Sequence, residues 1–144
     1  MCRGPSENVS SQEEQTSASG VVTKLSPRSV ADTVARLTEI LEAKGIKLFA
    51  TIDHGGEAQA AGLDLRETKV VIFGSPVAGT PIMQAVPLAA LDLPLKVLIW
   101  ADGNQTKVSY APPAVLARRY GLSDDLAARL AAIDAVTDAL IAEW

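Results

Sequence analysis

Residues 68–73, Thr-Lys-Val-Val-Ile-Phe, constrain the fold more than any other stretch of the chain. Successive side chains of a β-strand point to opposite faces, so a run of consecutive apolar residues is buried on both sides. The run ends at Gly74-Ser75-Pro76, a combination that breaks a strand and begins a turn. These residues predict a central strand that ends sharply.

The chain from residue 20 onward supplies the other elements of a two-layer α+β domain. Further strands are expected at residues 20–25, 46–53, 95–101 and 105–110, the last two joined by the hairpin signal Asp102-Gly103-Asn104. Helical periodicity predicts a helix that starts at Ser26-Pro27 and ends at Gly45, and a final helix capped by Ser123 and continuing to Leu140. Short helical segments are expected at residues 57–61, after Gly79-Thr80-Pro81, and at 114–120.

The expected order is therefore β-α-β-β-β-β-α. It predicts an antiparallel sheet of about five strands with two main helices on one face, as in TATA-binding-protein-like folds. Residues 1–19 are polar, with Val9 as a lone aliphatic, and are expected to form a flexible tail ahead of a single domain at 20–144.

Composition excludes several classes of function. The net charge is -4 and no basic cluster is present, which argues against nucleic acid as a partner. No run approaches the ~18 apolar residues of a membrane span. The one cysteine, Cys2, allows neither an internal disulfide nor a Cys-rich zinc site, and it is expected to be an inert thiol. We therefore expect a cytoplasmic protein.

Several motifs together carry a resemblance to a known family. They are Ile52-Asp53-His54, Ala61-Gly62-Leu63, Ile72-Phe73-Gly74-Ser75-Pro76 with Gly79-Thr80, Leu91-Asp92-Leu93-Pro94, and Tyr110 before Pro112. Over residues 20–142 the chain resembles the domain of unknown function 302 family. Ser75 stands where such domains usually have Asn. The resemblance implies a compact, often dimeric α+β domain with no established reaction.

His54 is the only histidine and the one candidate for acid–base chemistry, within Asp53-His54-Gly55-Gly56-Glu57. Strand alternation places it on the face of Leu48, Ala50 and Ile52 and turns Asp53 away from it, so Glu57 or Asp92 would have to orient the imidazole. The alternative is a structural histidine at the rim of the sheet. As a metal ligand His54 lacks partners, so no metal and no cofactor are expected.

A second candidate site is the turn after the central strand. Gly74, Ser75, Gly79 and Thr80 could present backbone amides and a hydroxyl to an anion, although neither a P-loop nor a nucleophile elbow is present. The alternative is a plain structural turn. Tyr110 is a candidate site wall, or else a core residue with its hydroxyl at the surface; Met83 and Trp100 are interpreted as packing or interface residues.

Two helices can cover only one face of the expected sheet. The other face is also expected to be apolar, through Phe49, Phe73 or Val71, Leu98 and Trp100. Large exposed apolar patches are rare on monomers, so this second face predicts a homodimer. A ligand floor is the alternative.

These residues support three hypotheses for function. The first is a homodimeric module that binds a small ligand near His54, Ser75, Thr80 and Tyr110. The second is an enzyme that uses His54 as general acid or base on a small carbonyl or ester compound. The third is a structural or partner-binding protein without a pocket.

Overall fold

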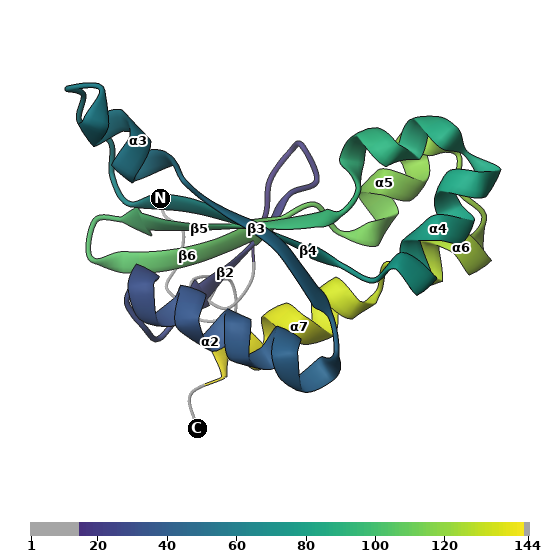
Figure 1. Cartoon of the computed structure of the whole chain (residues 1–144), viewed down its shortest axis with the longest axis horizontal. Helices are drawn as coiled ribbons and strands as arrows, with labels where there is room; N and C mark the ends of the chain where they lie inside the picture. Colours follow the sequence, from purple (N-terminus) through teal and green to yellow (C-terminus); the bar gives the residue numbers. More distant parts are fainter. Residues whose placement is uncertain (1–14, 143–144) are drawn as a thin grey trace, which may run out of the picture.

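A computed structural model describes residues 15–142, which form a six-stranded antiparallel sheet with helices against one face and at both ends (Figure 1). The sheet order is β1-β2-β6-β5-β4-β3. The strands are β1 Gln15–Thr16, β2 Val22–Ser26, β3 Lys47–Asp53, β4 Thr68–Gly74, β5 Leu95–Asp102 and β6 Gln105–Tyr110. The helices are α2 Val30–Lys44, α3 His54–Ala60, α4 Pro76–Ala85, the 3-10 helix η1 Pro87–Asp92, α5 Pro113–Tyr120, α6 Asp124–Ala128 and α7 Ala132–Ile141.

The expected two-layer α+β architecture is confirmed, with one strand more than expected. The extra strand, β1, pairs Gln15 with Thr23 and Thr16 with Val22, so the sheet begins inside the stretch assigned to the polar tail. The rest of that tail, residues 1–14 with Cys2, lies outside the described residues.

Helices α2 and α7 cover one face of the sheet and form the core with it (Figure 1). Alternate residues of the central strands point into this core, as the alternation of apolar positions predicted. Its fully buried side chains include Leu37 and Leu41 of α2, Ile133 and Leu140 of α7, and Val71, Phe73, Val97, Ile99 and Val108 of the sheet. Burial of each such side chain contributes about 1.5–3 kcal/mol to folding.

Phe73 belongs to this core, so its expected place on the second sheet face is wrong. It is 1% exposed and pairs with Leu95, whose side chain also faces the helices. The face opposite the helices carries Leu98 and Trp100, as expected, and also Val70, which pairs with Leu98.

A β-bulge corrects the predicted alternation along β3. Leu48 pairs with Phe73, but Ala50, two residues on, pairs with the neighbouring Ile72, so the register shifts between them. A bulge adds a residue without a partner, here Phe49, and turns the later residues of the strand to the opposite face. Leu48 and Ala50 therefore lie on opposite faces.

Several helix boundaries differ from the predictions, among them that of α3, which begins at His54 and not at residue 57. Ser29, not Ser26, caps α2, and its hydroxyl accepts a hydrogen bond from the Asp32 amide at 3.1 Å. Helix α4 begins at Pro76, because a proline at the first helical position gives up no hydrogen bond, and Pro81 lies inside the helix. The single final helix that was predicted is two, α6 and α7, with a break at residues 129–131.

Candidate functional site

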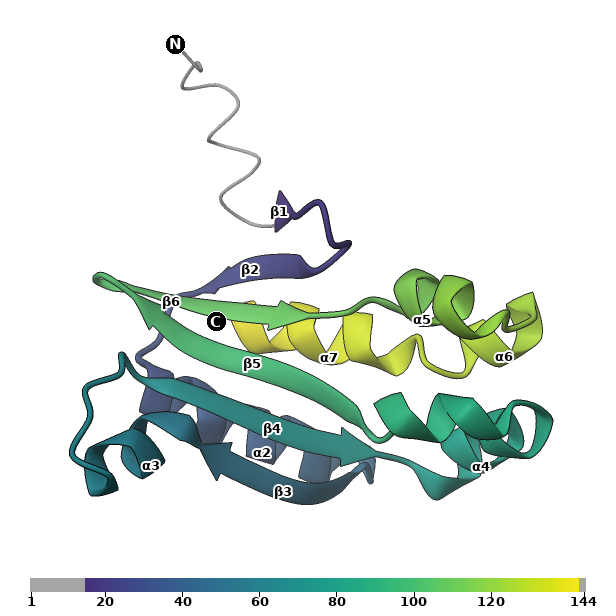
Figure 2. The same cartoon turned by 90° about the horizontal axis from the view of Figure 1, so that it is seen from above.

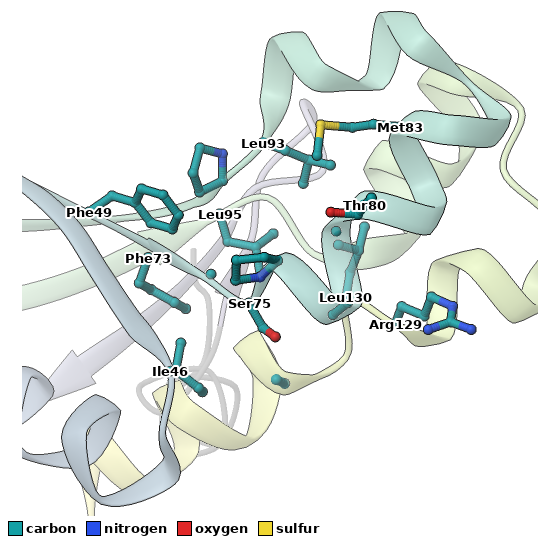
Figure 3. A pocket seen from close by; sticks show the side chains of 16 residues that line it. Ile46, Phe49, Phe73, Ser75, Thr80, Met83, Leu93, Leu95, Arg129 and Leu130 are labelled. Atoms are coloured by element: carbon teal, nitrogen blue, oxygen red, sulfur yellow. The ribbon is translucent and has the colours of Figure 1, made fainter.

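The end of β4 and the start of α4 form one wall of a pocket at one end of the sheet (Figure 3). Strand β4 ends at Gly74, and Ser75 then caps α4. The facing wall comes from Leu93-Pro94, joined by a cis peptide bond, at the start of β5. The break between α6 and α7 contributes Arg129 and Leu130.

The pocket has a volume of about 250 Å³ and an apolar lining. Figure 3 shows Phe49, Leu93 and Met83 on one side, with Ser75 and Leu130 across from them. Its other apolar contributors are Ile46, Phe73, Pro76, Ala78, Pro94, Leu95 and Ala132. A cavity of this size holds on the order of ten non-hydrogen atoms, at the small end of ligand pockets.

Three polar side chains reach the pocket, from Ser75, Thr80 and Arg129. The Ser75 hydroxyl makes no capping bond to α4. Within residues 15–142 none of the three side chains hydrogen-bonds to another residue. Thr80 turns its hydroxyl toward the middle of the lining residues, and Arg129 lies at their edge (Figure 3). The pocket therefore offers hydroxyl donors and one cation to a mostly apolar guest.

Four of the sequence-predicted residues, Gly74, Ser75, Gly79 and Thr80, line this pocket together. The glycine at 79 keeps one side of α4 open: a Cβ there would lie 3.9 Å from the Met83 methyl carbon. Met83, interpreted from sequence as a packing residue, is thus a pocket residue.

His54 lies at the other end of the sheet. It is exposed, as the first residue of α3, and β3 separates it from Gly74: Lys47, at the start of that strand, pairs with Gly74, whereas Asp53, at its end, pairs with Lys69. Seven residues of strand span roughly 20 Å. The structure therefore separates His54 from the 74–80 turn within one chain.

Within residues 15–142, neither Glu57 nor Asp92, the two carboxylates expected to orient the His54 imidazole, hydrogen-bonds to it. Asp53 accepts a hydrogen bond from the Gly56 amide at 2.9 Å and so caps α3. Asp92 accepts hydrogen bonds from Arg119 at 2.7 Å and from the Tyr120 hydroxyl at 2.5 Å, near the pocket end. Across residues 15–142 the imidazole of His54 has no hydrogen-bond partner.

Tyr110 is a core residue and does not line the 74–80 pocket. It is 4% exposed, and its hydroxyl donates to Asp134 of α7 at 2.6 Å. The Lys24 ammonium lies 5.1 Å from the centre of its ring. Burial and the hydrogen bond to Asp134 raise the pKa of the Tyr110 hydroxyl. Tyr110 also borders a second cavity, of about 320 Å³, beside Leu98 and Ser109.

Sequence reasoning missed Arg129 and Leu130 as pocket residues. Both lie where the predicted final helix breaks, and nothing in the sequence around residue 129 marks that break as part of a site. Phe49 was assigned to a dimer face; its role in the pocket results from the bulge, which has no local sequence signal.

The part of the chain that the structure describes holds no group of three or more His, Cys, Asp or Glu side chains able to bind a metal ion. Nor does any helix between residues 15 and 142 combine the length and apolar character needed to cross a bilayer.

This chain is similar to a solved structure and to curated proteins from Brucella. One is a crystal structure of an uncharacterized conserved DUF302 protein from Bacillus stearothermophilus, with a TM-score of 0.72, 20% identity, and coverage of 84% of this chain and 94% of that one. The other is a set of curated relatives from Brucella. Those from Brucella suis biovar 1 (strain 1330) and Brucella abortus biovar 1 (strain 9-941) are both named "Fluoride-specific ion channel FluC 1".

Both Brucella proteins are 42% identical to this chain over 112 residues, which is 76% of the chain. The chain spans only 44% and 42% of their respective lengths. Residues 22–140 match the family described as "Domain of unknown function DUF302". That match takes in the whole sheet from β2 to β6, both covering helices and the pocket, and the chain belongs to this family.

Proposed function

We propose that this domain binds a small, largely apolar molecule that carries one anionic or hydroxyl-accepting end. The observation that supports this is the pocket beside the 74–80 turn, whose walls are apolar and whose three polar side chains have no partner among residues 15–142. Apolar walls with a few convergent polar groups are typical of ligand sites. A medium-chain carboxylate such as octanoate matches this chemistry, with its tail in the pocket and its carboxylate beside Arg129.

Thermal shift with octanoate and octanol tests the proposal. Octanoate is expected to raise the melting temperature of the wild type, since a ligand that binds only the folded state stabilises it. The Gly79→Leu variant, whose added side chain fills the pocket, should lose this response. Arg129→Gln should weaken the response to octanoate and leave that to octanol unchanged. An equal response in wild type and Gly79→Leu would remove the pocket as the site.

The enzyme hypothesis has less support from the geometry. A general acid or base needs a reacting group within hydrogen-bond reach and a partner that holds its ring. His54 is exposed, and neither Asp53 nor Asp92 is directed to it. Ligand binding at the 74–80 pocket is therefore the preferred function.

A second candidate function rests on the Brucella relatives. Proteins that are named fluoride-specific ion channels contain a stretch 42% identical to this chain. We propose that such a domain serves as an accessory to an ion channel, with the occupied pocket altering transport. Fluoride efflux from vesicles holding the Brucella suis protein, with and without the matching 112 residues, is the test. Octanoate should alter efflux only when that stretch is present, and no effect on the full protein would contradict the proposal.

A further inference from the structure

Residues 54–67, which we name the α3 arm, have little packing within their own chain. None of the residues of α3 is buried, and two of its seven residues are glycines, which are poor helix formers. Leu63 and Leu65, which come after the helix, are 64% and 49% exposed. Short helices are marginal in water without tertiary packing. The arm therefore has the character of a segment that packs against another molecule.

The arm lies on the side of the sheet that no long helix covers. In Figure 1, α3 extends away from the sheet on the side opposite α2 and α7. The uncovered face carries an apolar patch on strands β3, β4 and β5, and in Figure 2 these strands run from α3 at one end to α4 and α5 at the other. The patch consists of Ile52, Val70, Ile72, Leu98 and Trp100.

Charge differs between the two ends of this face. The arm carries Glu57, Asp64 and Glu67 against Arg66, a net charge of -2 with His54 neutral. At the other end, residues 70–91 hold no charged side chain. The charges there include Lys47, whose ammonium lies 5.0 Å from the Phe49 ring, Lys96 on the uncovered face, and Arg129 at the pocket. The carboxylate of Asp92 at this end is balanced by Arg119, 2.7 Å away, so the end is basic.

Two copies can stack their uncovered faces about a two-fold axis in two ways. An axis along the strands places both acidic arms at the same end. An axis across the strands places each arm over the basic pocket end of the other copy. Like charges repel and opposite charges attract at such contacts, so the charge distribution favours the axis across the strands.

We propose that this chain forms a face-to-face homodimer in which each α3 arm crosses to the pocket end of the second copy. There the apolar Leu63 and Leu65 cover the edge of the pocket at Phe49, and the arm's acids face Lys47 and Lys96. The closure of the pocket rests on the proposed ligand-binding function, whereas the crossed arrangement does not. In this dimer His54, remote from the 74–80 turn of its own chain, lies near that of the other.

Disulfide trapping tests the arrangement in a Cys2→Ser background. Leu63→Cys with Ile72→Cys in the same chain should give a covalent dimer on oxidation, because Ile72 lies on the uncovered face toward the pocket end. Within one chain the arm leaves from the opposite end of β4, so no internal bridge competes. Leu63→Cys alone should stay monomeric on a non-reducing gel.

Three results would overturn the crossed arrangement. The first is a covalent dimer from Leu63→Cys alone, which would place the two arms together. The second is the absence of a covalent dimer from the double variant. The third is a wild-type protein that is monomeric by light scattering.

Octanoate affinity separates the dimer from the pocket function. Leu63→Asp is expected to weaken binding about tenfold, whereas Leu88→Asp, at a leucine that is 69% exposed outside the arm, should not. If octanoate binding is lost in Gly79→Leu but unchanged in Leu63→Asp, the pocket is the ligand site and the α3 arm does not close it. If the double-cysteine variant is trapped as a dimer but the protein does not bind octanoate, the crossed arrangement stands and the proposed ligand-binding function is wrong.

Discussion

Lys24 is 3% exposed, and its ammonium group lies between β2 and α7 with hydrogen-bond acceptors and an aromatic ring around it. It donates to Thr137 and to Asp138, each at 2.8 Å, and lies over the Tyr110 ring. Burial lowers the pKa of Lys24, but the hydrogen bond to Asp138 and the contact with Tyr110 outweigh it, and the pKa is raised. A charge buried in this way is balanced by its partners, but an apolar side chain can replace it.

Substitution of Lys24 tests that balance. Lys24→Met keeps the volume, and because Asp138 is 70% exposed it leaves no buried charge behind; we expect a loss of less than about 1.5 kcal/mol in the free energy of unfolding. Lys24→Ala leaves a cavity and should cost about 2–4 kcal/mol. Urea unfolding measures both. Equal losses would show that the ammonium, not the packed stem, carries the stability.

The buried Lys24 ammonium also predicts that the free energy of unfolding depends on pH in the alkaline range. A pKa raised in the folded state adds stability that is complete below the unfolded value of 10.5 and is lost as pH rises through the folded value. Wild type should therefore lose stability relative to Lys24→Met as the pH passes above about 10.5. Urea titrations from pH 8 to 11 would show it, and a constant difference would refute it.

The contribution of Asp92 to stability is expected to be lost toward low pH, not toward high pH. Its hydrogen bond from Tyr120, together with that from Arg119, lowers the pKa of Asp92 below 3.8. A lowered pKa adds stability above the unfolded value that disappears as pH falls through the folded one. Asp92→Asn should cost roughly 1 kcal/mol at neutral pH, and the difference should shrink as the pH falls below 3.8 and through the lower pKa of the folded state. A difference that persists there would point to a steric origin.

The pocket residues differ in whether neighbouring residues in the sequence were enough to predict their place in the pocket. Gly74, Ser75, Gly79 and Thr80 come after a strand within a few positions, so the sequence places them together without knowledge of the fold. Arg129 reaches the same pocket from the far end of the chain. Its position depends on tertiary packing, which no local pattern encodes.

At the scale of elements, glycine caps were well predicted and helix starts less so. Gly45 ends α2 in the left-handed conformation, with φ at 70°, as expected. The choice between Ser26 and Ser29 as the cap depends on where the helix meets the sheet: Ser26 is the last residue of β2, and its hydroxyl is 2.7 Å from that of Thr33. Both serines match the pattern, and packing selects one of them.

Replacement by alanine is expected to lower the free energy of unfolding by different amounts at two glycines that have positive φ. A Cβ at Gly45 would meet nothing within 4 Å, so Gly45→Ala should cost only the backbone strain, about 1 kcal/mol. At Gly20 a Cβ would lie 2.6 Å from a methyl group of Val115, in addition to a φ of 87°. Gly20→Ala should therefore cost at least about 2 kcal/mol. Thermal unfolding of both variants compares them, and equal losses would contradict the clash.

At the scale of the whole molecule, the order of strands and the helix layer were predictable because alternation and hairpin signals are local. The relation between His54 and the 74–80 turn was not. It depends on the antiparallel pairing of β3 with β4, which sets these two motifs at opposite ends of the sheet. The bulge between Leu48 and Ala50 also put Ala50 and Ile52 on the face opposite to that of Leu48, whereas alternation predicted one face for all three.

The pocket as a ligand site is the central claim, and the Met83 methyl group reports on it directly. Met1 and Met83 are the only methionines of the chain, so methyl-¹³C methionine labelling gives an assignable spectrum. Titration with octanoate is expected to shift the Met83 signal until it saturates and to leave that of Met1 in place, with no such shift in Gly79→Leu. A Met83 signal that does not respond to octanoate, or responds equally in Gly79→Leu, would contradict the account.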